Sequence, residues 1–407
     1  MSSSSPIIAI SGVTLTGNMG GVAMLRTAVA NMQRRFPSAR FRLLSVSPDR
    51  DRKARQLDNV EVVPCAAPRL LLIYLPLAIL AWPFVRFPAV RRILCKIAYF
   101  RALHEADLVV DLCGIAFVDG RGLALLAYNV ACCLPAIVFG TPIAKLSQAL
   151  GPFRSLPNRM AAKIVLERCK VVVARGKRSF EFLRELGLTN TYVLPDVTFA
   201  MEIQEAELAA AQSLLRQNGV ATGRPVIFSP SEVVNRLCSR AGIDFESECT
   251  AFLKTLTGKG HQVLLLPHSL ARDRSKNNDV ALCRRIADRV GHPVKLIEVE
   301  DPGILRAIIA EAEIFIGCRF HSVVGALATG VPALIIGWSH KYEEMAEALG
   351  AGRYAMDWRS FNAQSALCAF EALYADRASV RKAIGERLPQ VRADAERNFD
   401  LAASLIQ

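Results

Sequence analysis

The sequence predicts an α/β protein built from two doubly wound domains. Short, continuous apolar runs recur along the chain, and each is followed by a stretch with helical character. Such runs are typical of parallel strands that are covered on both faces. The pattern stops in a polar stretch between residues 200 and 223 and then begins again. With 407 residues, 52% of them hydrophobic, the chain is long enough to bury two cores.

The first half of the chain holds an N-terminal, Rossmann-like domain, which we place at residues 1–200. Its first strand is expected at 7–12, and a glycine-rich turn at 17–21 then leads into a helix at 22–36. Further strands are expected at 41–46, 60–64, 108–111, 137–140 and 171–173.

The second half predicts another Rossmann-like domain, which we place at residues 201–385. Its strands are expected at 225–230, 263–268, 294–298, 314–317 and 333–337. Ligands of such sheets bind outside the carboxyl ends of the strands, so we predict a ligand cleft between the two domains. The last residues, 386–407, predict an amphipathic helix that packs back onto the first domain.

The charge balance favours an anionic partner. The net charge is +13 and the sequence pI is about 9.4, which suits an anionic ligand or surface. A basic surface that serves solubility would give the same balance. Basic residues are not interleaved with aromatic ones in the manner of single-strand binding proteins, so we predict no nucleic-acid partner.

The eleven cysteines show none of the spacings that are typical of zinc sites. Many lie within apolar segments, as at 131–134 and 316–318, and we interpret them as reduced core residues. This favours the cytoplasm, and we predict neither a metal nor a cofactor. The first residues are serine-rich and lack a basic region, so no signal peptide is expected.

One segment of the first domain, residues 70–101, combines apolar and basic character. Residues 70–85 carry no charge and include Pro76 and Pro83, and five basic residues follow up to Arg101. The uncharged run is shorter than the roughly 20 residues of a spanning helix, and two prolines interrupt it. Two interpretations stay open: peripheral contact with an anionic membrane surface on its inner face, or a pair of helices buried in the domain.

The clearest candidate site follows the apolar strand at 314–317. Arg319 and His321 lie in the turn after this strand, and Ser322 is expected to cap the next helix. Amides at a helix N-terminus attract phosphate or carboxylate, and an arginine beside them adds a forked donor. A histidine at the same place can donate a proton. The turn therefore predicts an anion site with acid catalysis, although a purely structural turn would show the same pattern.

Several short motifs, in their order along the chain, resemble those of the polysaccharide pyruvyl transferase family. The C-terminal signature of that family stands here as Arg319-Phe320-His321, a small-residue helix at 326–328, a Gly-x-Pro turn at 330–332, and Lys341. The resemblance covers most of residues 10–352, and it implies the GT-B architecture, in which two Rossmann-like domains face a cleft. Weaker matches lie at 151–153, 173–179, 186–187, 195–197 and 266–268.

The resemblance implies a transferase that moves a pyruvyl group from phosphoenolpyruvate to a sugar and forms a pyruvate ketal. The sugar acceptor belongs to a polysaccharide or to a glycolipid. His321 is the predicted acid, and Asp111 or Asp119 is the predicted base for the sugar hydroxyl. The predicted donor-binding residues are Arg175, Arg319, Ser322, Lys341 and His268, and the predicted acceptor-binding residues are Asn18, Gly20 and Gly114.

The sequence departs from the family at two turns of the first domain. The family's Asn-x-Gly-Asp is here Asn18-Met19-Gly20-Gly21, and its glycine-rich strand end is here Asp111-Leu112-Cys113-Gly114. Both turns are expected to face the sugar, so the departures fit either a changed acceptor or a lost activity.

Two rival functions remain. A nucleotide-sugar-dependent GT-B glycosyltransferase would need an acid that binds a ribose, and Glu343 or Glu344 could serve. A non-catalytic protein that binds a membrane surface through its basic residues would explain the charge but not the Arg-x-His strand end. Binding of phosphoenolpyruvate, compared with binding of nucleotide sugars, discriminates between the two enzymes. Affinity for anionic vesicles or DNA without donor turnover would favour the non-catalytic protein.

Overall fold

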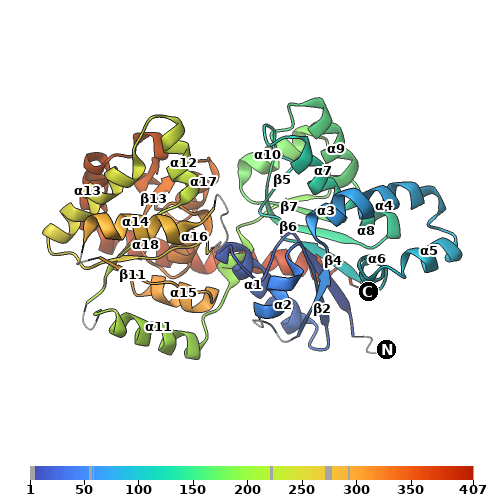
Figure 1. The fold of residues 1–407 in the computed structure, drawn as a ribbon, viewed down its shortest axis with the longest axis horizontal. Coiled ribbons are helices and arrows are strands. Elements are labelled where there is room, and N and C mark those ends of the chain that lie inside the picture. The colour runs from blue at the N-terminus through green and yellow to red at the C-terminus, as the bar shows by residue number, and fades with distance from the viewer. Residues whose placement is uncertain are drawn as a thin grey trace. The chain divides into compact units, whose positions relative to one another are not determined.

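The structure is a computed structural model that describes residues 5–54, 57, 59–220, 223–270, 277–291 and 294–406. It contains two compact units, each built around a parallel sheet (Figure 1). Unit 1 comprises residues 1–15, 24–200 and 393–407, and unit 2 comprises residues 16–23 and 201–392. The predicted fold class, two parallel sheets with helices between the strands, is confirmed.

The sheet of unit 1 has the strand order β3-β2-β1-β4-β6-β7-β8, and β5 pairs with β6. Ile8 of β1 pairs in parallel with Phe41 on one side and with Leu108 on the other. Both partner residues, Phe41 and Leu108, are apolar and buried, as expected of a sheet that is covered on two faces. The strands are β1 (Ile7–Ser11), β2 (Arg40–Ser45), β3 (Val60–Pro64), β4 (Leu108–Asp111), β5 (Ile115–Ala116), β6 (Ile143–Leu150), β7 (Val171–Ala174) and β8 (Thr191–Val193).

The helices of the first half alternate with these strands and include a cluster of short helices at residues 67–104. α1 begins within the 16–23 segment of unit 2 and continues into unit 1. The helices are α1 (Met19–Arg35), α2 (Pro48–Ala54), α3 (Ala67–Arg69), α4 (Leu75–Ala81), α5 (Pro88–Leu94), α6 (Ala98–His104), α7 (Leu123–Ala131), α8 (Leu134–Phe139), α9 (Leu156–Leu166) and α10 (Lys177–Glu185).

The strand predicted at 137–140 is wrong. Residues 137–139 form the last turn of α8, which Gly140 ends in a left-handed conformation with φ of 77°. Pro135 lies in the first turn of this helix, where its missing N–H costs nothing. The buried strand next along the chain is β6, which starts at Ile143. A short apolar run fits a buried helix and a buried strand equally well, which explains the error.

The sheet of unit 2 has the strand order β11-β10-β9-β12-β13-β14, with all pairs parallel. Its strands are β9 (Val226–Ser229), β10 (Val263–Leu265), β11 (Val294–Leu296), β12 (Ile314–Gly317), β13 (Ala333–Gly337) and β14 (Ala355–Asp357). Its helices are α11 (Glu205–Gln217), α12 (Glu232–Arg240), α13 (Phe245–Gly258), α14 (Asp279–Val290), α15 (Pro302–Ala310), α16 (Phe320–Ala328), α17 (Lys341–Ala348) and most of α18 (Ala363–Ala403).

Two segments group differently from the predicted domains at 1–200, 201–385 and 386–407. Residues 16–23 belong to unit 2, although they precede most of unit 1 in the chain. The end of α18, from residue 393, belongs to unit 1, where Asp400 forms an ion pair with Arg35 and Asn398 donates to the carbonyl of Pro195. The two long helices α1 and α18 therefore each contribute to both units.

Candidate active site

The candidate site lies at the carboxyl ends of four neighbouring strands of unit 2, β10, β9, β12 and β13. His268 follows β10, and Arg319 and His321 follow β12. Lys341 follows β13, after a short turn. Parallel strands present their carboxyl ends at one edge of the sheet, so sequence segments far apart in the chain meet there.

A buried carboxylate that the sequence analysis missed, Asp279, organises this edge. Asp279 is the first residue of α14 and is fully buried. Its two oxygens accept hydrogen bonds from the backbone N–H of Glu232 (2.9 Å), the backbone N–H of Ser269 (3.0 Å) and the guanidinium of Arg319. One carboxylate thus joins the loops that follow β9, β10 and β12. The sequence signal that could have pointed to Asp279 is the Asn278-Asp279 pair, because an asparagine is a common cap at the start of a helix and Asn278 caps α14.

Arg319, a predicted donor-binding residue, is paired with a carboxylate of the protein itself. Its Nε lies 2.8 Å and its Nη2 2.6 Å from the two oxygens of Asp279, and Nη2 also donates to Asn277 at 2.7 Å. The side chain is only 13% exposed. Its charge is therefore matched by an internal carboxylate, and the geometry does not support Arg319 as an unpaired cation that binds the donor. The pair instead fixes the turn that carries His321.

Ser322 also has a different place from the one predicted. α16 begins at Phe320, with Arg319 as the N-cap, so Ser322 lies inside the first turn. The hydroxyl of Ser322 is buried and donates to the carbonyl of Arg319 at 2.8 Å. It closes the turn from within rather than capping the helix.

His321 packs against a glycine that comes from the start of the chain. A methyl group added to Gly20 would lie 2.5 Å from Cγ and 2.8 Å from Cβ of His321. No side chain larger than hydrogen fits at residue 20 unless His321 or the turn moves. The structure thus brings together Gly20 and His321, which are 301 residues apart in the sequence.

The turn at residues 16–20 also contacts the loop after β10. The N–H of Met19 donates to the carbonyl of His268 (3.2 Å), and the N–H of Leu270 donates to the carbonyl of Gly17 (2.7 Å). Asn18 forms an antiparallel bridge with Ser269, and its side chain accepts from the N–H of Gly20. Asn18 and Gly20 were predicted to bind the acceptor from the first domain. They group instead with His268 and His321 in unit 2.

His268 is a neutral, buried histidine. Burial lowers its pKa well below the ordinary value, and the nearby positive charges of His321, Arg319 and Arg306 lower that pKa further. Its Nε2 is buried and has no hydrogen-bond partner among the residues that the structure describes. A buried ring nitrogen in this state is suited to a hydrogen bond with a bound molecule.

Lys341 is buried among aromatic rings at the first position of α17. Its Nζ lies 4.7 Å from the ring centre of Trp338 and 5.3 Å from that of Phe320. Ring faces attract a cation electrostatically. Phe320 is the residue before His321, so Lys341 packs against the turn that carries His321.

The remaining predicted residues, in unit 1, are held by internal contacts. Asp111 is fully buried, forms an ion pair with buried Lys145 and accepts from the N–H of Cys113 (2.8 Å). Arg175 is buried against Asp196 (2.6 Å) and donates to the carbonyl of Gly114 (2.9 Å). Neither donor binding by Arg175 nor proton abstraction by Asp111 is supported by this geometry.

Asp119 fixes the start of α9. It accepts hydrogen bonds from the N–H of Arg154 (2.6 Å), from the hydroxyl of Ser155 (2.5 Å) and from the side chain of Asn158 (3.0 Å). Partial burial raises the pKa of Asp119, but these hydrogen bonds outweigh it and lower the pKa below the ordinary value. A carboxylate in this state is a weak base, so its predicted role as base is also unsupported.

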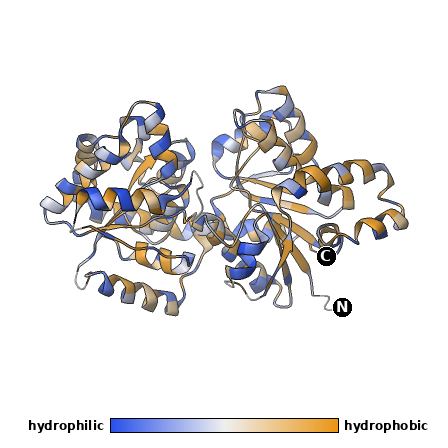
Figure 2. Cartoon of the chain, in the orientation of Figure 1, coloured by the Kyte–Doolittle hydropathy of each residue, from blue (hydrophilic) through white to orange (hydrophobic). Residues whose placement is uncertain are grey.

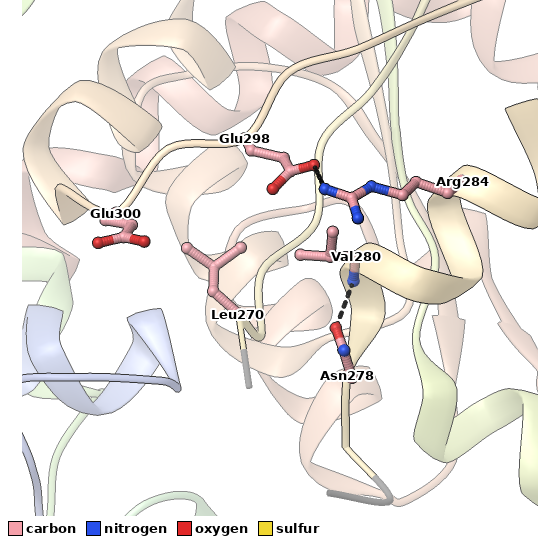
Figure 3. A pocket seen from close by; sticks show the side chains of 6 residues that line it. All are labelled: Leu270, Asn278, Val280, Arg284, Glu298 and Glu300. Carbon is pink, nitrogen blue, oxygen red and sulfur yellow. Dashed lines mark hydrogen bonds and ion pairs between the residues drawn. The ribbon is translucent and has the colours of Figure 1, made fainter. Parts of the chain in front are cut away.

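A cavity of about 360 Å³ lies beside the site in unit 2. Leu270 and Asn278 border it from the loops next to His268 and Asp279, and Arg284 within it is paired with Glu298 at 2.5 Å (Figure 3). With Glu300 as a second acid, the lining suits hydroxyl groups better than a multiply charged anion. Within the described ranges, no group of three His, Cys, Asp or Glu side chains is arranged to hold a metal ion.

Solved structures with the same fold define the class of protein. The chain resembles HepE of Anabaena, solved with UDP and glucose, at a TM-score of 0.55 and 15% identity, covering 99% of this chain and 97% of that one. It also resembles UDP-GlcNAc 2-epimerase of Neisseria meningitidis at a TM-score of 0.59 and 12% identity, covering 96% and 97%. At these identities the likeness shows the fold alone, which is that of the GT-B proteins.

Within this class, the chain belongs to the polysaccharide pyruvyl transferase family, whose model matches residues 18–340. It is 24% identical over 269 residues to the amylovoran biosynthesis protein AmsJ of Erwinia amylovora. That alignment covers 63% of this chain and 63% of the relative, so the chain spans somewhat less than two thirds of the curated protein it matches. The predicted family is confirmed.

Proposed function

We propose that the chain transfers the pyruvyl group of phosphoenolpyruvate to two hydroxyls of a sugar in a polysaccharide or glycolipid, forming a cyclic ketal. The observation that carries this proposal is the pair formed by His321 and neutral His268 at the strand ends of unit 2, in a chain of the pyruvyl transferase family. The N-terminus of α16 beside His321 and the nearby Lys341 add positive potential for phosphate and carboxylate.

The reaction needs one proton delivered to carbon and one to phosphate. Protonation of the methylene carbon C3 makes a methyl group and leaves C2 open to attack by the first sugar hydroxyl. The C2–O bond to phosphate then breaks, and the second hydroxyl closes the ketal. The two hydroxyl protons lost by the sugar balance the proton gained by C3 and the one gained by phosphate. We assign His321 to donate the proton to C3 or to the leaving phosphate.

We assign His268 to hydrogen-bond the donor through its buried Nε2, because a neutral imidazole can donate or accept without adding charge. The acceptor base is left unassigned, since Asp111 and Asp119 are both engaged within unit 1. The eleven unpaired cysteines favour a reducing compartment, and we place the reaction in the cytoplasm.

The test is phosphate release from phosphoenolpyruvate with a panel of glycan acceptors. His321→Gln keeps the volume and polarity of the side chain but cannot deliver a proton, so we expect kcat to fall by about 10²–10⁴-fold. His261→Gln is the matched control, because His261 packs on Phe370 elsewhere in unit 2. Equal turnover in the wild type and His321→Gln would reject the assignment. Binding of UDP or GDP sugars in place of phosphoenolpyruvate would favour a nucleotide-sugar transferase.

A further inference from the structure

The segment from Ala67 to Lys96, here called the docking segment, has an apolar face that the protein does not cover. It consists of α3, a π-helical turn at Leu70–Tyr74, α4, a 3₁₀ turn at Trp82–Phe84, and α5. Its inner face packs into unit 1, where Tyr74 stacks on Tyr99 with ring centres 4.6 Å apart. Figure 2 shows α4 and α5 largely in the hydrophobic colour, although they lie at the outer edge of unit 1.

The outer face of the docking segment is apolar as well. Leu72 is 77% exposed, Leu80 70% and Ile93 64%, and only 22% of the window from Ala67 to Phe84 is buried. A surface helix of a protein that meets only water normally turns polar residues outward. Several large apolar side chains exposed on one short segment point to a site of interaction. The other large exposed apolar side chains of the segment are Ile73, Ile79, Trp82, Phe84 and Phe87.

The charges around this face identify the occupant. Residues 62–104 contain six Lys or Arg and no Asp or Glu. The whole chain has 37 acids among 407 residues, or about one in eleven, so a run of this length would ordinarily contain several. Arg86, Arg92 and Lys96 are exposed, and the guanidinium of Arg86 lies over the exposed ring of Phe87, 5.2 Å from its centre. Apolar side chains flanked by cations, with no acid between them, complement an anionic lipid surface.

The segment is suited to lie on a bilayer rather than to cross it. By length and composition alone, Ala67–Phe84 is the one helical stretch of the described residues that could span a membrane. Its inner side chains, among them Leu70, Tyr74 and Ala78, belong to the core of unit 1, and a spanning helix would have to withdraw them. We infer that the docking segment binds the surface of an anionic bilayer, with its outer apolar residues in the interface and its basic residues on the lipid headgroups. This inference is independent of the reaction proposed above.

The test is flotation of the purified full chain with preformed vesicles of phosphatidylcholine, with and without phosphatidylglycerol. We expect binding to the anionic vesicles and little to the neutral ones. Each Lys or Arg near an anionic surface contributes roughly fivefold, so Arg86→Gln with Arg92→Gln and Lys96→Gln should weaken binding about 100-fold. The control, Arg353→Gln with Arg359→Gln and Lys382→Gln, removes the same charge from exposed sites of unit 2 and should leave binding unchanged.

The apolar contribution is tested separately by Leu72→Ser with Leu80→Ser. Both side chains face solvent, so folding should be retained, and we expect vesicle binding to fall at least about tenfold through lost apolar burial. Leu208→Ser in α11 is the control. Absence of binding to anionic vesicles, or equal loss in the control variants, overturns the inference. It is also overturned if the Leu72, Leu80 change dissociates a dimer in sedimentation velocity while vesicle binding persists, since the face would then join two copies.

Discussion

Replacing Gly20 by alanine should separate the stability of the protein from its activity. Gly20 is the second residue of α1, and its backbone lies outside the left-handed region that only glycine adopts readily. Alanine there should gain about 0.5–1 kcal/mol of helix propensity. The same methyl group would meet Cγ of His321 at 2.5 Å, where ordinary contacts begin at 3.4 Å.

The methyl group can be accommodated only if His321 and the turn separate by at least about 0.9 Å, the difference between these two distances, because Nδ1 of His321 lies nearer still. A displacement of a reacting group by about 1 Å can cost roughly 10²-fold in rate. We therefore expect Gly20→Ala to lower kcat for phosphate release about 100-fold while the midpoint of thermal unfolding changes by only a few degrees.

Gly385→Ala is the matched control for this prediction. Gly385 lies within α18, and a methyl group added there meets no atom within 4 Å. It should gain the same propensity, about 0.5–1 kcal/mol, with unchanged turnover. If Gly20→Ala turns over like the wild type, His321 does not act from the position that Gly20 imposes. Circular dichroism melting and the phosphate assay on the three proteins decide the matter.

Three further predictions concern the buried ionisable side chains. Arg319→Ala should destabilise unit 2 by about 3–5 kcal/mol in urea denaturation, because it leaves the buried Asp279 carboxylate unpaired. A variant that keeps the stability of the wild type and only binds the donor more weakly would contradict this prediction. Asp111→Asn should also lower the free energy of unfolding, because it leaves the buried ammonium group of Lys145 without its carboxylate. The activity of the folded variant should change at most modestly. His268 stays neutral when folded, so below a pH of about 6.5 only the unfolded chain takes up its proton, and stability should fall by about 1.4 kcal/mol per pH unit. His268→Gln should remove this slope between about pH 6.5 and 5, and a slope equal to that of the wild type would show that His268 titrates normally.

Most of the strands could be predicted, because their apolar runs end at turns that the sequence marks clearly; β5, β6, β8 and β14 were not. Ile314–Gly317 and Ala333–Gly337 agree with the predicted residues, since each strand ends at a glycine and Pro332 precedes the second. The same reasoning failed at 137–140, where Pro135 and Gly140 begin and end a helix instead of bordering a strand.

The partners of the site residues could not be predicted, because they depend on which loops the sheet brings together. Arg319 and Asp279 are 40 residues apart, and no spacing rule relates a turn after β12 to the start of α14. An arginine at a strand end therefore predicted an anion site, whereas its anion is a carboxylate of the protein itself. Gly20 was predicted to bind the acceptor, but its contact with His321 depends on residues 16–23 joining unit 2.

These pairings change how the site can use charge. Because Asp279 neutralises Arg319, this arginine holds the turn after β12 in place but adds no net charge to the site. The same carboxylate joins the loops that follow β9, β10 and β12. Buried ion pairs of this kind fix geometry more than they add stability. His268 is neutral beside His321, so the two rings do not compete to carry positive charge. In the proposed reaction His321 is the residue assigned to carry the proton, and the absence of a side chain at Gly20 leaves room for its ring.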